Sequence, residues 1–282
     1  MPVFQTQNAL QIELKKAQNQ SKKIGFVPTL GALHMGHLSL LEESLSENEI
    51  TVLSIFVNPT QFNNADDLNK YPRTLEKDVE LVNKLNKNIF IYAPSVSDIY
   101  EGNTVSASFD YDGLEHQMEG KHRPGHFDGV GTIVKKLFEI VKPTNAYFGE
   151  KDFQQLQIVR KLVSKHKIPV NVIPCKIYRE TTGLAMSSRN ERLSEKARNE
   201  SKLIHKILLE AKDKFRLKSA KKVSQFVVSE FKKHKNFTLE YFEIAEEETL
   251  LTCKRKIKNK NYRGFIAVFI ENIRLIDNIS LK

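Results

Sequence analysis

The first 175 residues alternate short apolar runs with helical patterns, and this alternation restricts the fold more than any other feature of the sequence. The apolar runs have the length and composition of buried β-strands and lie at residues 24–27, 50–57, 89–93, 146–149 and 170–174. Helical spacing of apolar residues occurs between these runs, at residues 38–43, 74–85, 130–141 and 153–165. Repeated strand–helix–strand units predict an α/β domain whose parallel sheet is covered on both faces.

The pattern changes after residue 175. Two long helical stretches and three β-like runs follow, at residues 194–214, 220–233, 237–244, 264–270 and 273–277. We therefore expect a first domain over residues 1–175 and a smaller α+β domain over residues 176–282, joined by a short hinge. Within the first domain, residues 105–111 alternate apolar and polar side chains, which predicts an edge strand or a flap.

The composition favours a folded protein outside the membrane. The chain has 282 residues, of which 40% are hydrophobic, so it can bury a substantial core. No apolar run approaches the roughly 20 residues that a membrane-spanning helix needs, and residues 1–6 lack a signal-peptide pattern. We therefore expect a cytoplasmic protein without a membrane partner. Cys175 and Cys253 lack the spacing of a disulfide framework or a zinc site, so we expect both to be buried or partly buried.

The positive charge is concentrated in the second domain. The formal net charge is +10, and residues 176–282 carry 25 Lys and Arg against 14 Asp and Glu. A basic domain suits an acidic partner such as a nucleotide or a nucleic acid. A lysine-rich solvated surface is favoured over RNA binding, because the runs 232–235 and 254–260 contain no interleaved aromatic side chains. An RNA-binding module would be distinguished by a steep loss of affinity with rising salt.

Two histidines follow the first apolar run. Gly31 and Gly36 lie in the turn after this run and allow a ligand to approach the backbone closely. His34 and His37 lie at or just before the start of the next helical pattern, where backbone N–H groups and the helix dipole favour an anion. Because imidazoles placed there can donate hydrogen bonds to phosphoryl oxygens, this HxGH pattern predicts a nucleotide-phosphate site. The alternative is two surface histidines beside a turn.

Other polar segments also follow expected strands. The amides of Asn58 and Gln61 suit recognition of hydroxyls and a carboxylate, unless they only cap a turn. Lys151 can neutralise phosphate charge and Asp152 can accept from a ribose hydroxyl, although this segment taken alone is an ordinary polar helix start.

Residues 186–190 supply hydroxyls and a guanidinium, as a lid over a polyphosphate would. The glycine-rich segment 119–130 opens a further helix and could be structural.

Six motifs in order along the chain resemble those of one enzyme family. They are VPTLGALHMGH from Val27, SIFVNPTQF from Ser54, YPRTLEKD from Tyr71, EGKHRPGHFDGV from Glu119, YFGEKDFQQ from Tyr147 and GLAMSSRN from Gly183. HxGH with a downstream hydroxyl-and-base loop resembles the HxGH nucleotidyltransferase superfamily, and the full set resembles its pantoate-beta-alanine ligase family. The resemblance covers both expected domains and implies a Rossmann-like N-terminal domain with a smaller α+β lid domain.

The resemblance implies a ligation in two steps. ATP and pantoate give pantoyl adenylate and pyrophosphate with Mg²⁺, and the amine of beta-alanine then attacks the mixed anhydride to give pantothenate and AMP. It further implies ATP as a co-substrate, no tightly bound organic cofactor, no nucleic-acid partner and a homodimer. The alternative enzyme is another HxGH adenylyl- or cytidylyltransferase, for whose phosphorylated substrate Arg and Lys would be expected in place of the amides Gln61 and Gln155.

The resemblance also implies roles for individual residues. Catalytic roles fall to His34, His37, Lys151 and Arg189, with His37 as the proton donor. ATP-binding roles fall to Leu30, Gly31, Ala32, Leu33, His34, Met35, Gly36, His37, Gly149, Glu150, Lys151, Asp152, Tyr178, Met186, Ser187, Ser188 and Arg189. Pantoate-binding roles fall to Asn58, Gln61 and Gln155, and Gln61 also serves beta-alanine. Asp78 is implied as a candidate Mg²⁺ ligand.

Overall fold

The computed structural model describes residues 2–62 and 65–282 and divides into two compact units. The first unit comprises the described residues of Met1–Glu115, together with Gly120–Glu150 and Gln155–Lys176. The second unit comprises His116–Glu119, Lys151–Gln154 and Ile177–Lys282. Two short segments that precede residue 175 in the sequence thus belong to the second unit.

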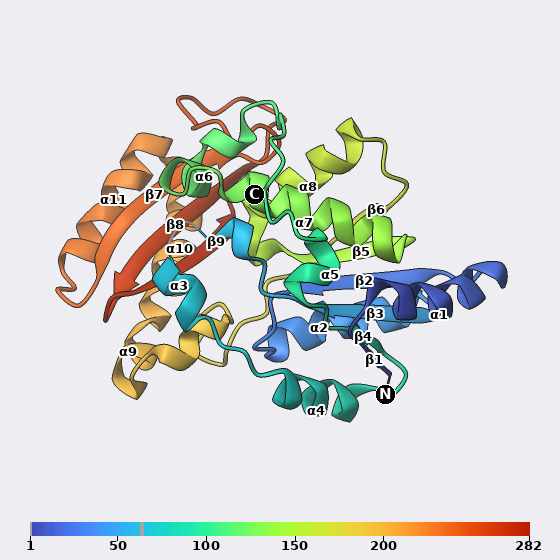
Figure 1. The fold of residues 1–282 in the computed structure, drawn as a ribbon. Helices are drawn as coiled ribbons and strands as arrows, with labels where there is room; N and C mark the ends of the chain where they lie inside the picture. Colours follow the sequence, from blue (N-terminus) through green and yellow to red (C-terminus); the bar gives the residue numbers. More distant parts are fainter. Residues whose placement is uncertain (1, 63–64) are drawn as a thin grey trace. The chain divides into compact units, whose positions relative to one another are not determined.

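The first unit is built on a parallel sheet (Figure 1). Among the described residues the strand order is β1-β4-β3-β2-β5-β6, and each pair of neighbours is parallel. The strands are β1 (Val3–Phe4), β2 (Ile24–Thr29), β3 (Ile50–Ile55), β4 (Phe90–Tyr92), β5 (Asn145–Gly149) and β6 (Asn171–Cys175). This topology confirms the α/β, Rossmann-like prediction.

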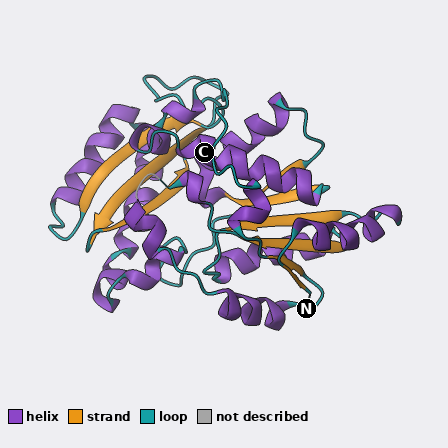
Figure 2. Ribbon diagram, viewed as in Figure 1, coloured by secondary structure: helices purple, strands orange, loops and turns teal. Residues whose placement is uncertain are grey.

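Helices lie on both faces of this sheet, and Figure 2 shows them in purple beside the orange strands. The first unit contains, in whole or in part, α1 (Gln7–Asn19), α2 (Met35–Glu47), α3 (Ala65–Lys70), α4 (Leu75–Leu85), α5 (Val96–Tyr100), α6 (Met118–His122), α7 (His126–Val141) and α8 (Phe153–Lys165), of which α6 and α8 begin in the second unit. On β2, Val27 packs in a cluster with Leu38 and Leu41 of α2. The adjacent Phe26 packs edge-on against Phe138 of α7, with ring centroids 6.2 Å apart. Because both faces are covered, the strand is apolar on both sides.

The order of the strands creates a switch point beside β2. The chain adds β3 and β4 on one side of β2, whereas β5 and β6 lie on the other side. In an open parallel sheet, ligands bind at such a point, in the crevice outside the carboxyl ends of the two neighbouring strands. Here β2 leads into the HxGH turn and β5 ends at Gly149.

Residues 105–111 do not form a strand, so of the two predicted alternatives, an edge strand or a flap, the edge strand is wrong. The backbone N–H of Ala107 donates to Thr132 Oγ1 at 2.9 Å, and that of Phe109 donates to Asp128 Oδ1 at 3.0 Å. Both acceptors are side chains of α7. They bind the backbone groups that a neighbouring strand would otherwise pair with, so the segment is held along a helix without joining a sheet.

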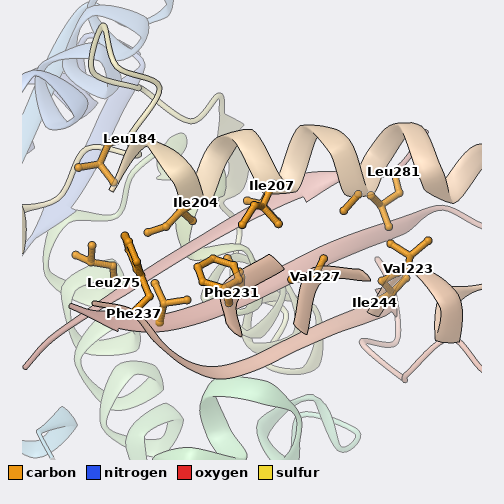
Figure 3. Close-up of a cluster of buried hydrophobic side chains, with 14 of the residues drawn as sticks. Leu184, Ile204, Ile207, Val223, Val227, Phe231, Phe237, Ile244, Leu275 and Leu281 are labelled. Atoms are coloured by element: carbon orange, nitrogen blue, oxygen red, sulfur yellow. The ribbon is translucent and has the colours of Figure 1, made fainter. Parts of the chain in front are cut away.

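The second unit packs helices against an antiparallel sheet. In the described residues the strand order is β7-β8-β9, formed by β7 (Thr238–Glu246), β8 (Tyr262–Ile270) and β9 (Ile273–Ser280). The helices are α9 (Glu195–Glu200), α10 (Lys202–Leu217) and α11 (Ala220–Lys232). Figure 3 shows side chains of α10, such as Ile204 and Ile207, in one buried cluster with Val227 and Phe231 of α11. The α+β prediction for this unit is confirmed.

A partly buried ion-pair network ties residue 119 into the second unit. Glu119 accepts two hydrogen bonds of 2.8 Å from the Arg274 guanidinium and one of 2.7 Å from the Tyr241 hydroxyl. Burial disfavours the charge on Arg274, but its hydrogen bonds to Glu119 and Glu240 outweigh this effect and raise its pKa. Gln154 adds a further link, because its side chain accepts from the backbone N–H of Glu119 at 2.9 Å.

Two sequence-based expectations about composition can be compared with the structure. Cys175 and Cys253 are both buried free thiols, as expected, and burial raises the pKa of each. Among the described residues, no helix combines the length and the apolar character needed to cross a membrane.

Candidate functional site

The first helical turn of α2 fixes both histidines of the HxGH motif. His34 is the N-cap residue, and its Nδ1 accepts from the backbone N–H of Gly36 at 3.1 Å. His37 Nδ1 accepts from the backbone N–H of His34 at 3.3 Å, and the two rings stack with centroids 4.0 Å apart. Because each Nδ1 acts as an acceptor, the proton of a neutral ring lies on Nε2. The backbone thereby sets the tautomer of both imidazoles, with the donor on the Nε2 edge.

The turn before these histidines has an unusual backbone. Gly31 has φ +84° and Ala32 has φ +50°, so two consecutive residues lie in the left-handed region. The N–H groups of Ala32 and Leu33 donate to the two carboxylate oxygens of Asp78, at 3.0 and 2.8 Å. Asp78 lies in the first turn of α4 and is buried.

Asn58 is fully buried and orients Gln61. Asn58 Nδ2 donates to Gln61 Oε1 at 3.2 Å and to the carbonyl of Gly129 at 3.1 Å. Asn58 Oδ1 accepts from the Tyr100 hydroxyl at 2.6 Å and from the Thr60 hydroxyl at 3.2 Å. Burial raises the pKa of Tyr100, which keeps its hydroxyl a donor. These contacts use the hydrogen-bonding capacity of the Asn58 amide and direct the amide nitrogen of Gln61 away from Asn58.

The glycine-rich segment 119–130 supports the main chain of Gln61. His126 is buried, and its Nδ1 lies 2.8 Å from the Gln61 carbonyl oxygen, to which it can donate. Its Nε2 lies 3.2 Å from Arg123 Nη1, which also fits a ring that carries its proton on Nδ1. The 3₁₀ helix η1 (Pro59–Gln61) is thus held from two sides, by Asn58 and by His126. Sequence reasoning gave this segment no such role, because the contact joins residues 65 positions apart.

Gly129→Ala should destabilise this arrangement. A Cβ at residue 129 would lie 2.4 Å from the Thr60 carbonyl oxygen and 2.7 Å from Gln61 Cα, and these backbone atoms cannot rotate away. Overpacking of this kind costs about 1–3 kcal/mol, and we expect a loss of that size in the free energy of unfolding, measured by urea denaturation. Glu139→Ala, at an exposed position of α7, is the control and should change it by less than about 0.5 kcal/mol. If Gly129→Ala lowered the free energy of unfolding no more than Glu139→Ala does, η1 would have moved to accommodate the Cβ without a loss of stability.

The other predicted positions of the first unit lie near the end of β5. Gly149 ends this strand, and a Cβ there would meet nothing within 4 Å among the described residues, so packing within the chain does not explain the glycine. The open space leaves room for a ligand against the backbone. Glu150 begins the 3₁₀ helix η3 (Glu150–Asp152), and Gln155 lies partly exposed near the start of α8.

In the second unit, strand β9 anchors the segment that carries Lys151. The carbonyl of Lys151 accepts from Asn278 Nδ2 at 2.8 Å, and Asn278 Oδ1 accepts from Arg263 Nη1 at 2.6 Å. The ammonium of Lys151 lies 3.4 Å from Asp152 Oδ1. Asn278 is buried in β9 and holds Lys151 through the main chain.

The predicted lid loop is internally braced. The carbonyl of Tyr178 accepts from the backbone N–H of Met186 at 3.0 Å, which ties the two ends of the loop together. Ser187 caps the 3₁₀ helix η4 (Ser188–Arg192), since its hydroxyl accepts from the N–H of Arg189 at 3.3 Å. Ser188 and Arg189 are partly exposed at the start of this helix.

A buried asparagine supports this loop from within the second unit. Asn190 Nδ2 donates to the Ala185 carbonyl at 3.1 Å and to Glu180 Oε1 at 2.8 Å. Arg198 binds both oxygens of Glu180, at 3.0 and 3.1 Å, and these hydrogen bonds raise the pKa of Arg198. Sequence reasoning included Asn190 in the predicted lid segment 186–190 but assigned this supporting role neither to Asn190 nor to Glu180.

The predicted site residues are thus divided between the two units. The first unit contains Leu30, Gly31, Ala32, Leu33, His34, Met35, Gly36, His37, Asn58, Gln61, Asp78, Gly149, Glu150 and Gln155. The HxGH turn, η1 and Gly149 follow or end β2, β3 and β5, so they belong to the carboxyl edge of one sheet. The second unit contains Lys151, Asp152, Tyr178, Met186, Ser187, Ser188 and Arg189.

The described part of the candidate site has few side chains that could hold a metal ion. No group of three or more His, Cys, Asp or Glu side chains that could hold a metal ion occurs in the part of the chain that the structure describes. Mg²⁺ bound to a nucleotide usually keeps several waters and takes only one or two protein carboxylates. The predicted ligand Asp78 directs both oxygens at backbone N–H groups, so its geometry does not fit direct coordination of a cation.

A Rossmann-like sheet with the HxGH turn at its switch point defines a nucleotide-binding enzyme of the HxGH class. The family model of pantoate-beta-alanine ligase matches residues 2–280. Pantothenate synthetases from Flavobacterium psychrophilum and Christiangramia forsetii are 65% and 50% identical to this chain over 282 residues, with 100% of both chains covered in each case. The chain therefore belongs to the pantoate-beta-alanine ligase family.

Solved structures agree with this assignment. The crystal structure of pantothenate synthetase from Thermus thermophilus has a TM-score of 0.91 at 36% identity and covers 100% of this chain and 99% of that chain. Pantoate-beta-alanine ligase from Francisella tularensis, in complex with beta-gamma ATP and beta-alanine, has a TM-score of 0.80 at 34% identity, with 100% and 98% covered. The fold of the chain is therefore that of solved members of the family.

Proposed function

We propose that this chain, a ligase that condenses pantoate with beta-alanine using ATP, works through a pantoyl-adenylate intermediate. The observation that carries the proposal is the pair of imidazoles held by the backbone at the N-terminus of α2, in a full-length member of the family. A carboxylate is a poor acyl donor, and adenylation gives its acyl carbon a good leaving group.

The first step transfers the adenylyl group. A carboxylate oxygen of pantoate attacks the α-phosphorus of ATP, the bond from that phosphorus to the bridging oxygen breaks, and pyrophosphate leaves. His34 and His37 donate from Nε2 to the phosphoryl oxygens, and the dipole of α2 favours the same negative charge. In this proposal His37 is the proton donor, while Lys151 and Arg189 neutralise the pyrophosphate charge.

The second step forms the amide. The amine of beta-alanine attacks the acyl carbon, the bond from that carbon to the phosphate oxygen breaks, and AMP leaves with its electron pair. Water must be excluded while the mixed anhydride waits for the amine. We assign this exclusion to residues 186–189, which act as a lid over the phosphates. Gly149, Glu150, Asp152 and Tyr178 complete the proposed nucleotide site.

Pantoate is held by neutral amides in this proposal. Gln61 and Gln155 bind the acid directly, and Gln61 also serves beta-alanine. Asn58 contributes to the pantoate site indirectly, because its amide is already used to orient Gln61. The amides favour a carboxylate substrate over the phosphorylated substrate of other HxGH transferases, which would call for Arg or Lys at these positions.

Three further parts of the proposal concern cofactors, assembly and location. Mg²⁺ would enter together with ATP and would supply charge neutralisation at the phosphates. No tightly bound organic cofactor is needed for either step. The enzyme is proposed to act as a homodimer, which sedimentation velocity can test, and to work in the cytoplasm, where its co-substrate ATP is available.

The test of the adenylate is pyrophosphate exchange. Labelled pyrophosphate should enter ATP when the protein, Mg²⁺ and pantoate are present without beta-alanine. Exchange under these conditions requires that the acid and ATP react reversibly before the amine binds. Exchange only in the presence of beta-alanine would contradict a separate adenylation step, and exchange supported by a phosphorylated acid in place of pantoate would favour the transferase alternative.

Gln155→Ala should weaken binding of pantoate far more than binding of ATP. The lost hydrogen bond to a charged group is worth about 1.5–3 kcal/mol, which corresponds to roughly a 10- to 150-fold rise in the dissociation constant of pantoate. Isothermal calorimetry with each ligand measures both effects. Gln157→Ala, on the same helix, is the matched control and should change neither. Equal losses for the two ligands would remove Gln155 from the pantoate site.

A further inference from the structure

The carboxylate of Asp78 is an acceptor for the turn that precedes the HxGH histidines. Asp78 is 3% exposed, and its Oδ2 accepts from the N–H of Ala32 while its Oδ1 accepts from the N–H of Leu33. Thr74, at the start of the same helix, donates its hydroxyl to Oδ1 at 3.2 Å. Three donors thus fix the carboxylate, and two of them belong to the backbone of one turn.

The backbone of this turn explains why it needs an anion. Gly31 and Ala32 have positive φ angles of 84° and 50°, and the N–H groups of Ala32 and Leu33 both point at one carboxylate, as the N–H groups of an anion-binding turn do. A non-glycine residue in the left-handed region is also strained, so Ala32 needs outside support. In this protein the anion bound by the turn is a side chain of the chain itself.

We propose that Asp78 is a positioning residue that holds the start of α2, and with it His34 and His37, in the geometry used for adenylation. His34 directly follows Leu33, whose N–H is bound to Asp78, so any shift of this hydrogen bond moves the N-cap. The assignment rests on the proposed function only for its kinetic test, since the hydrogen bonds themselves can be tested without substrate.

The same geometry argues against a direct bond from Asp78 to Mg²⁺. Each oxygen faces the positive end of a backbone N–H dipole, which would repel a cation placed in the same direction. Mg²⁺ needs oxygen ligands at about 2.0–2.1 Å in a nearly octahedral arrangement, and Asp78 would have to give up its bonds to the turn to provide one. Asp78 therefore acts on the nucleotide through the turn.

The decisive variant is Asp78→Asn, which keeps the size of the side chain but turns one acceptor into a donor that faces a backbone N–H. We expect the rate of pantoate-dependent pyrophosphate exchange to fall about 10- to 100-fold, as for a misplacement of catalytic groups. The KM for ATP and the Mg²⁺ concentration at half-maximal rate should change by less than about threefold. Glu76→Gln, an exposed position in the first turn of the same helix, loses the same charge and should leave all three values unchanged.

A rise of more than about tenfold in the Mg²⁺ requirement, with the rate recovered at high Mg²⁺, would overturn the proposal and make Asp78 a metal ligand. Amide hydrogen exchange measured by NMR without ligands gives an independent readout. The amides of Ala32 and Leu33 should exchange faster in Asp78→Asn than in the wild type. Unchanged exchange at both amides would also overturn the proposal, even if the enzyme did not form an adenylate.

Thr74→Val covers the case in which Asp78→Asn does not fold. Thr74 is the N-cap of α4 but makes no side-chain capping hydrogen bond, so the substitution removes mainly the hydroxyl that orients Asp78. We expect a several-fold loss in exchange rate, faster exchange of the Leu33 amide, and no change in the Mg²⁺ requirement. Wild-type behaviour of Thr74→Val in both assays, together with an unfolded Asp78→Asn, would limit Asp78 to a role in folding.

Discussion

His37→Ala should lower the rate of pantoyl-adenylate formation by about 10²–10³, the scale expected when one fixed donor to transition-state charge is removed. The ring of His37 is held at the first turn of α2 by the hydrogen bond between its Nδ1 and the N–H of His34. Its Nε2–H is therefore oriented before the substrate binds. Single-turnover formation of adenylate, measured by quenched flow, gives the rate directly.

A second substitution separates the two roles of this side chain. His37 occupies position N3 of the α2 capping box, and alanine removes both the cap and the donor to phosphate. Glutamine at N3 can restore the reciprocal cap, since Gln is a preferred residue of this motif. We expect His37→Gln to recover stability without recovering the rate. A His37→Gln enzyme within a few-fold of wild type would assign the loss in His37→Ala to the helix start.

Arg189→Ala should slow the first half-reaction by about 10² and leave the second within a few-fold of wild type. The reason is that pyrophosphate charge develops only while ATP is being cleaved. Amine attack can be measured separately on preformed pantoyl adenylate. Arg192→Ala, at an exposed position of the same 3₁₀ helix, is the matched control. A mutant slowed only in the second half-reaction would mean that Arg189 serves beta-alanine capture.

The proposed role of Arg189 in the lid can also be tested without catalytic turnover. ATP with Mg²⁺ should slow hydrogen exchange across residues 183–190, and Arg189→Ala should abolish much of that protection. The loop is already braced by Asn190 and Ser187, so the added protection has to come from its exposed side chains. Equal protection in the wild type and the variant would show that Arg189 does not contact the nucleotide.

The fold was largely predictable from the sequence, because burial imposes a local pattern. Strand β2 begins with four buried residues, Ile24–Val27, and the turn glycines and helical spacing after it place His34 and His37 at a helix start. Residues 105–111 show the limit of this reasoning. Their alternation is a valid strand pattern, but Thr132 and Asp128 on α7 bind their backbone groups, and nothing local reveals such distant partners.

The support behind the candidate site was less predictable for the same reason. Asn58 was grouped with the pantoate ligands by its motif, whereas its contacts with Tyr100 and Gly129 show that it orients Gln61. Asp78 was predicted from its motif as a candidate Mg²⁺ ligand. Its hydrogen bonds from Ala32 and Leu33 were not predictable, because the left-handed conformation of Ala32 is rare for alanine. Motifs identify which residues matter, and only contacts over long sequence separations show how each one acts.

The membership of Glu119 and Lys151 in the second unit has a consequence for anyone who wishes to cut or recombine this chain. A fragment that begins at residue 177 would keep Arg274 and Tyr241 but lose the carboxylate between them, and a partly buried guanidinium would be left with fewer partners. Asn278 would likewise lose the Lys151 carbonyl. The C-terminal unit is therefore not a detachable module, and a chimera of two relatives should exchange residues 116–119 and 151–154 together with it.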